Sequence, residues 1–178
     1  INSFYPMPIA ETASTFCESI VVNEALKYAE GNEKINILEN DIMGLTQCVV
    51  DIYSRFLFED AVFKKRKEGM LSSDELSALM TEAQKEAYGK GLDENCMHKY
   101  MWVCKPHYYD GEFNYYNFPY AFGALLSKGL YSLYKNMGKD FLPLYDRFLG
   151  ASSTMNLADV AKMADIDIYS RDFWLTGL

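Results

Sequence analysis

A long helical seam runs through residues 36–67, NILENDIMGLTQCVVDIYSRFLFEDAVFKKRK. Its apolar side chains recur every three or four residues, which is the period of one helix face: they are Leu38, Ile42, Leu45, Val49, Ile52 and Phe56. The stretch predicts one helix of roughly 45–50 Å, because each residue adds about 1.5 Å. Its basic end, Lys64-Lys65-Arg66-Lys67, is expected to be solvated and to complement the helix C-terminus. A binding patch is the less favoured interpretation of that run.

Other stretches with the same period predict helices on both sides of the seam. A first helix is expected from about Pro8, and a capping box of Ser72 and Glu75 opens another. A further helix is expected over residues 93–105, because Pro106 disfavours the α conformation of the residue before it. No segment alternates as a strand does. The pattern therefore predicts an all-α fold.

Length and composition agree with one globular unit. The chain has 178 residues, of which 49% are hydrophobic and 24% are charged, so it can bury a core. It contains no repeat of fixed period and no linker rich in Pro, Gly or Ser. We predict that residues 1–178 form a single helical unit, a multi-helix, bundle-like subdomain.

Charge and hydropathy limit the partners. Seventeen basic against twenty-five acidic residues give a formal charge of -8, which repels nucleic acid. The longest apolar runs, such as residues 118–126, are too short to span a membrane. Four cysteines without a CxxC pair indicate a reducing compartment, and we expect a cytoplasmic protein. The chain begins at Ile1 without a readable targeting peptide, so we treat it as a piece of a longer one.

Residues 106–120, PHYYDGEFNYYNFPY, form the stretch with the strongest functional signal. They combine an imidazole with many aromatic rings and show no clean period of 2 or 3.6. Polar ring groups in irregular chain either find buried partners or face a cleft. Both interpretations stay open, since the rings could simply pack.

The residues that bind transition metals are scarce. The chain has two histidines, His98 and His107, and neither belongs to an HExxH motif. Together with Cys96 and Cys104 they could make a structural Cys2His2 metal domain, although the spacings match no common zinc site. Glu11 is compatible with a solvated glutamate in the first helical turn.

Three stretches resemble the C-terminal part of oligoendopeptidase F and its relatives, the thimet-oligopeptidase-like zinc metallopeptidases. They are AETASTFCE at residues 10–18, a segment of residues 107–131 that contains YNFPYAFG, and DIDIYSRDFW at residues 165–174. The middle stretch is the most specific, because its aromatics, Pro and Gly recur in a fixed order. The resemblance spans nearly the whole chain.

The resemblance implies a zinc metalloendopeptidase that hydrolyses internal bonds of oligopeptides. In such enzymes an HExxH helix supplies two zinc ligands and a general base, and a Glu on a following helix completes the site. Glu11 matches that third ligand. Because HExxH should precede Ile1 and is not in this chain, we expect the isolated chain to be inactive. The implied partner is the N-terminal remainder of the same enzyme.

The resemblance also assigns roles in the aromatic stretch. His107, Tyr116 and Tyr120 match catalytic donors over the scissile carbonyl, whereas Tyr109 and Tyr115 match substrate-binding positions more loosely. Such groups would stabilise an oxyanion. The alternative from another class is a helical module that binds a peptide in this loop without chemistry.

Overall fold

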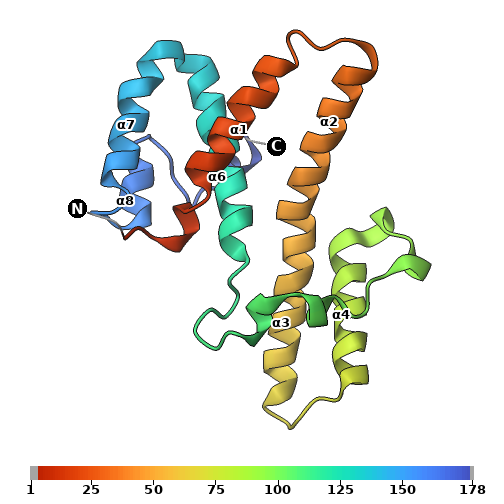
Figure 1. Ribbon diagram of the computed structural model, residues 1–178. Helices are drawn as coiled ribbons and strands as arrows, with labels where there is room; N and C mark the ends of the chain where they lie inside the picture. Colours follow the sequence, from red (N-terminus) through yellow and green to blue (C-terminus); the bar gives the residue numbers. More distant parts are fainter. Residues whose placement is uncertain (1–3, 177–178) are drawn as a thin grey trace. The chain divides into compact units, whose positions relative to one another are not determined.

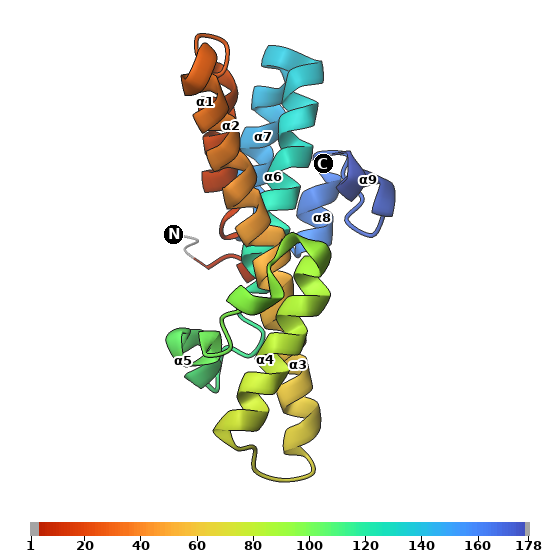
Figure 2. The ribbon, with the colours of Figure 1, turned by 90° about the vertical axis from the view of Figure 1, so that its right-hand side faces the viewer.

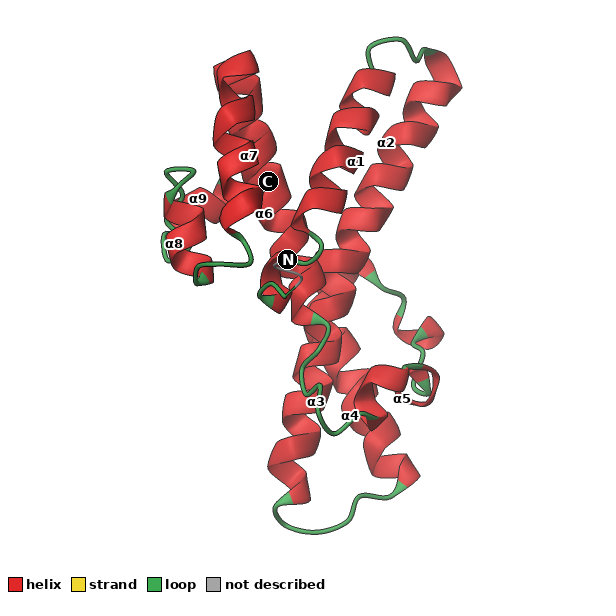
Figure 3. Cartoon of the chain, turned by 60° about the vertical axis from the view of Figure 1, so that its left-hand side comes forward, coloured by secondary structure: helices red, strands yellow, loops and turns green. Residues whose placement is uncertain are grey.

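The computed structural model describes residues 4–176 of the chain, and every regular element within that range is a helix. Figure 3 shows these helices in red with only turns and loops between them. The predicted all-α class is therefore confirmed. The chain forms two compact units: unit 1 comprises Ile1–Ile42 with Pro119–Leu178, and unit 2 comprises Met43–Phe118. That they act as a single domain stays a prediction.

Unit 1 is a group of helices from the two ends of the chain. Its elements are η1 (Met7–Ile9), α1 (Thr12–Ala25), most of α2 (Gly31–Thr46), nearly all of α6 (Phe118–Met137), η6 (Gly138–Asp140), α7 (Phe141–Ala151), α8 (Leu157–Lys162) and α9 (Arg171–Leu175). Helices α6 and α7 form an antiparallel pair in Figure 1, and α8 and α9 lie together in Figure 2. Gly138 makes the turn between α6 and α7 with a φ of 59°, which few other residues adopt.

The core of unit 1 is largely aromatic. The Phe16 ring lies 5.6 Å from Phe141 and 4.6 Å from Tyr145, measured between ring centroids. Phe148 stacks on Tyr145, while Leu126 and other aliphatic side chains fill the space around the rings. Burial of aromatic rings contributes large apolar areas and favourable edge and offset contacts. This core therefore joins α1 to α6 and α7.

The first helix begins later than its sequence predicts. Pro8 lies in the short 3-10 turn η1, and α1 starts only at Thr12. Between them Glu11 has a ψ of 0°, far from the value near −42° of a continuing α-helix. Glu11 consequently occupies the N-cap position of α1 and not its first turn.

The predicted seam is helical without a break from Gly31 to Arg66, but it contains a π-helical turn. Helix α2 passes through η2 (Gln47–Asp51), which is π-helical, into α3 (Ile52–Arg66). A π turn changes the rotation per residue and shifts the face that follows it. Before this turn Leu38 and Ile42 are 41% and 63% exposed, whereas Ile52, directly after it, is buried. The predicted long helix is therefore confirmed, but its apolar seam is not buried along its whole length.

Unit 2 is built on the hairpin of α3 and α4 (Ser73–Tyr88). It continues through η3 (Gly89–Gly91), η4 (Glu94–Cys96), α5 (Met101–Cys104) and η5 (Pro106–Tyr109). Phe58, Met80 and Ala83 form its buried centre. Leu76 and Leu79 of α4 pack against this centre, and the predicted capping box of Ser72 and Glu75 is present. None of the helices in residues 4–176 is long and apolar enough to cross a bilayer.

The helix predicted over residues 93–105 is wrong, because only two short helical pieces form there. The buried amide of Gln84 contacts the backbone of His98 twice: its Nε2 donates to the carbonyl oxygen at 3.0 Å, and its Oε1 accepts the N–H at 3.0 Å. Both backbone groups of His98 are thus bonded to a side chain and not to a helical turn. The tertiary contact breaks the helix.

We expect Ser72→Ala to lower the free energy of unfolding by about 1 kcal/mol, because it removes the N-cap acceptor of α4. The Ser72 hydroxyl accepts from the N–H of Glu75 at 3.3 Å, and the Glu75 carboxylate accepts from the N–H of Ser72 at 2.8 Å. Urea unfolding followed by circular dichroism measures the loss. Ser73→Ala, one residue further along the same exposed end, should change stability far less; equal losses in the two variants would contradict the capping role.

Candidate functional site

Glu11 presents a carboxylate that no cation neutralises within the part of the chain that the structure describes. Its Oε2 accepts one hydrogen bond, from the hydroxyl of Ser14 at 3.2 Å. Its backbone carbonyl accepts from the Thr15 hydroxyl at 2.7 Å. The side chain is half-buried at the start of α1. A carboxylate with so few partners has lone pairs left for a further ligand.

Helix α6 holds the start of α1 by a close backbone approach at Gly123. A Cβ atom at this glycine would lie 3.1 Å from the Glu11 Cβ and 3.2 Å from the Glu11 carbonyl carbon. The Thr15 hydroxyl also reaches the Gly123 carbonyl oxygen at 3.3 Å. Tyr120 precedes Gly123 by three residues and therefore shares its helix face. Within unit 1 the fold thus brings Glu11 to the face of α6 that carries Tyr120.

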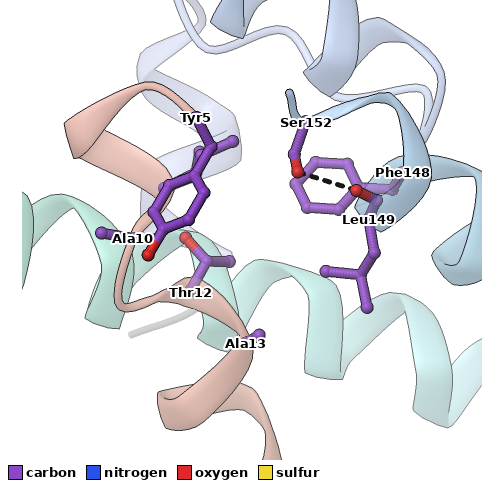
Figure 4. Close-up of a pocket in the computed structure, with 8 residues that line it drawn as sticks. Tyr5, Ala10, Thr12, Ala13, Phe148, Leu149 and Ser152 are labelled. Atoms are coloured by element: carbon purple, nitrogen blue, oxygen red, sulfur yellow. Dashed lines mark hydrogen bonds between the residues drawn. The ribbon is translucent and has the colours of Figure 1, made fainter. Parts of the chain in front are cut away.

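A small hollow of about 230 Å³ lies beside the chain that flanks Glu11, but the Glu11 side chain does not line it. In Figure 4, Tyr5 and Thr12 form one wall, and Leu149 and Ser152 form the other. The Thr12 hydroxyl is buried and has no hydrogen-bond partner among the residues that the structure describes. The hollow belongs to the packing of α1 against α7 and is separate from the carboxylate.

In unit 2, the aromatic loop brings His107 and Tyr116 together. Their rings stack with centroids 5.0 Å apart and planes inclined by 12°. Phe113 meets the Tyr116 ring edge-on at 5.5 Å. The Nδ1 atom of His107 is buried and has no hydrogen-bond partner within residues 4–176. Two of the predicted catalytic residues are therefore neighbours, and their stacking restrains the imidazole.

Tyr115 points back onto α3. Its backbone N–H donates to Glu59 Oε1 at 2.8 Å, and its hydroxyl donates to Asp60 at 3.2 Å. Its φ of 58° is unusual for a residue with a side chain, so the surrounding contacts hold a strained conformation. The ring packs between Phe56 and Phe63. Tyr115 thus anchors the loop in this structure, while its predicted contact with substrate stays a prediction.

A buried polar network secures the end of the same loop. The guanidinium of Arg55 forms an ion pair with Asp51 and donates to Asn117 Oδ1 at 3.1 Å. All three side chains are buried. The Tyr88 hydroxyl donates to Asp51 at 3.2 Å, and burial together with this carboxylate raises the pKa of Tyr88 to about 12. Tyr88 therefore remains a neutral donor at physiological pH.

Sequence reasoning missed Arg55 and its partners, although a signal was present. Asp51, Arg55 and Glu59 follow one another at intervals of four residues, which places them along one helix face. All three lie in the stretch predicted to be one long helix, and all three are buried in the structure. Charged residues regularly spaced beside an apolar seam indicate a paired, buried network, because an isolated buried charge is unfavourable.

Tyr109 lies at the surface of the loop. The residue is 63% exposed, and its hydroxyl donates to the Trp102 carbonyl oxygen at 3.0 Å. Neighbouring Tyr108 is half-buried with a buried hydroxyl: its ring packs on Phe58, and burial raises the pKa of this hydroxyl. The two tyrosines therefore differ in role, although they are adjacent in the sequence.

The alternative metal domain is not formed. Within residues 4–176, no three His, Cys, Asp or Glu side chains lie close enough together to hold a metal ion. The four residues of the proposed Cys2His2 set are Cys96, His98, Cys104 and His107. The first three are exposed on short helical pieces and connecting loop, and the thiol of Cys96 contacts Asp93. The His98 backbone is bonded to the Gln84 side chain.

Comparison with known proteins finds oligopeptidases. The chain is 28% identical over 171 residues to the Group B oligopeptidase PepB of Streptococcus agalactiae, and equally to an Oligoendopeptidase F homolog of Lactococcus lactis. It is 29% identical over 168 residues to Oligopeptidase PepF of Bacillus subtilis. No model of a protein family matches, and no solved structure does. The resemblance to oligoendopeptidase F is thus confirmed in sequence.

The matches cover this chain almost completely but the relatives only in part. They include 95% of the chain and 28% of the Streptococcus protein, and 93% of the chain and 25% of the Bacillus protein. The chain therefore spans about a quarter of the length of the curated relatives it matches. A site assembled from the whole of such a protein would draw only some of its residues from this chain.

We expect Gly123→Ala to destabilise unit 1 by about 1–3 kcal/mol, the usual effect of forcing an extra methyl group into a packed site. The new Cβ would press against the backbone at Glu11, which cannot move without shifting the start of α1. Thermal unfolding measures the effect. Gly150→Ala is the matched control, because its Cβ would meet nothing within 4 Å and alanine favours helix α7. A neutral Gly123→Ala would contradict the close packing.

We expect Glu59→Gln to raise the free energy of unfolding above that of the wild type, by an amount that increases with pH. Burial raises the pKa of Glu59 above its ordinary value of 4.5, so the folded state binds a proton more readily than the unfolded state. Glu59 therefore contributes stability fully when the pH is below its pKa in the unfolded state. This contribution is lost as the pH rises through its pKa in the folded state. Glutamine keeps an oxygen acceptor for the Tyr115 N–H but carries no charge.

Urea unfolding between pH 4 and pH 8 measures the difference between the two proteins. Glu86→Gln, on the exposed side of α4, controls for the loss of one negative charge. A difference between wild type and Glu59→Gln that stays constant, or that shrinks with rising pH, would contradict the raised pKa.

Proposed function

We propose that this chain is the C-terminal part of the catalytic domain of a zinc-dependent oligoendopeptidase, which hydrolyses internal peptide bonds of short oligopeptides. The observation that carries the proposal is similarity to proteins named as oligopeptidases along nearly the full length of this chain. The remainder of the enzyme, with HExxH, is the partner that the proposal requires. The 178 residues contain no such motif, so this chain alone is expected to be inactive.

The chemistry of Glu11 is compatible with one zinc ligand. Its side chain is half-buried, forms no ion pair within residues 4–176 and accepts one hydrogen bond at its carboxylate, from Ser14 at 3.2 Å. Catalytic zinc sites use three protein ligands, and a carboxylate is a common one. Since residues 4–176 hold no cluster of three ligand side chains, the other ligands must come from the partner.

Zinc, when bound, would polarise the scissile carbonyl and lower the pKa of a water molecule. The task of this chain is then to bind and orient the peptide. His107 and Tyr116 supply an imidazole and a phenol on one restrained pair of rings, and both groups can donate to an oxygen that gains negative charge. Tyr120, on the α6 face that meets Glu11, supplies a further phenol.

The anchoring of the loop supports this role. Oxyanion donors accelerate a reaction only when they are held in place before it begins. Glu59 and Asp60 hold Tyr115, and Arg55 holds Asn117, on the two sides of Tyr116. The ring of Tyr116 therefore projects from a stretch whose neighbours are both fixed to α3.

In the full-length enzyme we expect Glu11→Gln to weaken zinc retention by at least about 10-fold, because the amide carries no negative charge. Zinc content after dialysis measures the effect. Glu18→Gln is the matched control, since this exposed glutamate lies two turns further along α1. Equal zinc retention in the two variants would remove Glu11 from the metal site.

In the same enzyme we expect His107→Phe to lower kcat by about 100- to 1,000-fold with zinc still bound, because the ring stack survives and the donor is lost. Cleavage of an internally quenched peptide measures turnover. Near-normal turnover would remove His107 from the catalytic group. An intact protein that neither holds zinc nor cuts peptides would end the proposal and favour a binding module without chemistry.

A further inference from the structure

Unit 2 contains a hollow that the proposed reaction does not use. It has a volume of about 530 Å³, within the range of small-molecule sites. Phe58 and Val62 of α3, Leu76 of α4 and Trp102 of α5 are among the residues that line it. Tyr109 of η5 completes one side. The lining is therefore mainly apolar and aromatic.

The walls of this hollow are held in place. The Tyr109 hydroxyl donates to the Trp102 carbonyl oxygen at 3.0 Å, and the Trp102 indole N–H donates to the Ser77 hydroxyl at 3.3 Å. Phe58 is 3% exposed and belongs to the buried centre of the unit. A pocket that exists before its ligand arrives loses less free energy to ordering on binding.

One charged residue, Arg66, lines the hollow. It is the last residue of α3 and is exposed, and its guanidinium makes no ion pair or hydrogen bond within residues 4–176. Lys64 nearby differs, because it pairs with Asp60 at 2.5 Å. The guanidinium fork matches a carboxylate in two parallel hydrogen bonds. The basic run at the helix end thus contains one cation placed at an apolar pocket.

We propose that this hollow binds the carboxyl-terminal residue of an oligopeptide, with an apolar side chain against Trp102 and the terminal carboxylate on Arg66. An apolar carboxyl-terminal residue carries its side chain and a carboxylate on the same Cα. The lining offers an apolar surface for the side chain and a cation for the carboxylate. The inference rests on the proposed function in taking a peptide as the ligand.

The hollow is lined in part by the segment that carries His107. Tyr109 and His107 belong to the same short element, η5, so a ligand against Tyr109 contacts the segment that carries the proposed imidazole donor. The site would hold one end of a peptide at a fixed place on unit 2. It would thereby favour peptides with a free carboxyl terminus within reach.

Fluorescence of Trp102 tests the inference on the 178-residue chain itself. The chain has two tryptophans, Trp102 and Trp174, so a Trp174→Phe background leaves one reporter. The probes are N-acetyl-Ala-Phe as the free acid, its carboxyl-terminal amide, and N-acetyl-Glu-Phe-amide, which carries its carboxylate on a side chain. We expect the free acid to bind about tenfold more tightly than either amide, in line with a charge-assisted pair.

The Arg66→Gln variant should bind the free acid and its amide equally. Lys67→Gln is the matched control, because this neighbouring cation does not line the hollow. Val62→Phe, which fills the hollow, should weaken all three probes, and circular dichroism shows whether it folds. If Val62→Phe does not fold, the binding of the probes by Arg66→Gln is the deciding measurement.

Two results would overturn the inference: no change in Trp102 fluorescence at millimolar probe, or a preference for the acid that survives Arg66→Gln. Tightest binding by N-acetyl-Glu-Phe-amide would also overturn it, because the carboxylate would then not be the terminal one. The binding test measures no catalysis, so its result stands even if the intact protein proves unable to cut peptides. A hollow that binds nothing leaves the peptidase proposal standing.

Discussion

The buried guanidinium of Arg55 is the constraint on which unit 2 depends. A charge that is 7% exposed must be paired, and the chain supplies Asp51 one turn earlier and Asn117 from far along the sequence. Removing one partner of such a pair generally costs about 3–5 kcal/mol, because the remaining charge stays buried. The end of the aromatic loop, at Asn117, is therefore tied to α3 through the buried guanidinium of Arg55.

Unit 1 is organised by close approach and aromatic packing. Gly123 lets the chain at Glu11 come within van der Waals distance of α6, and Gly129 does the same for Phe173. The rings around Phe16 and Phe141 then hold α1 against the α6–α7 pair. The position of the carboxylate thus depends on a residue without a side chain, more than on any hydrogen bond that Glu11 makes.

Each unit, taken by itself, carries groups that the proposed function would use. Unit 1 provides a half-buried carboxylate and the Tyr120 face of α6. Unit 2 provides a restrained imidazole–phenol pair and, mainly on α3, α4 and α5, an apolar hollow with one cation. Neither set is a complete hydrolytic site, because residues 4–176 bring together no cluster of three metal ligands. A chain that spans about a quarter of its relatives is expected to hold such a partial set.

The sequence by itself determined the helical class, the long helix through residues 36–67, the capping box at Ser72 and the irregular aromatic loop, because periodicity, caps and prolines act locally. Only the tertiary structure decided that the helix predicted over residues 93–105 breaks at His98, that Tyr115 anchors the loop, and that Arg55 secures it. Each of these depends on a partner distant in the chain: Gln84, Glu59 and Asn117. Local patterns carry no record of such partners, since the contacts form only when the helices pack.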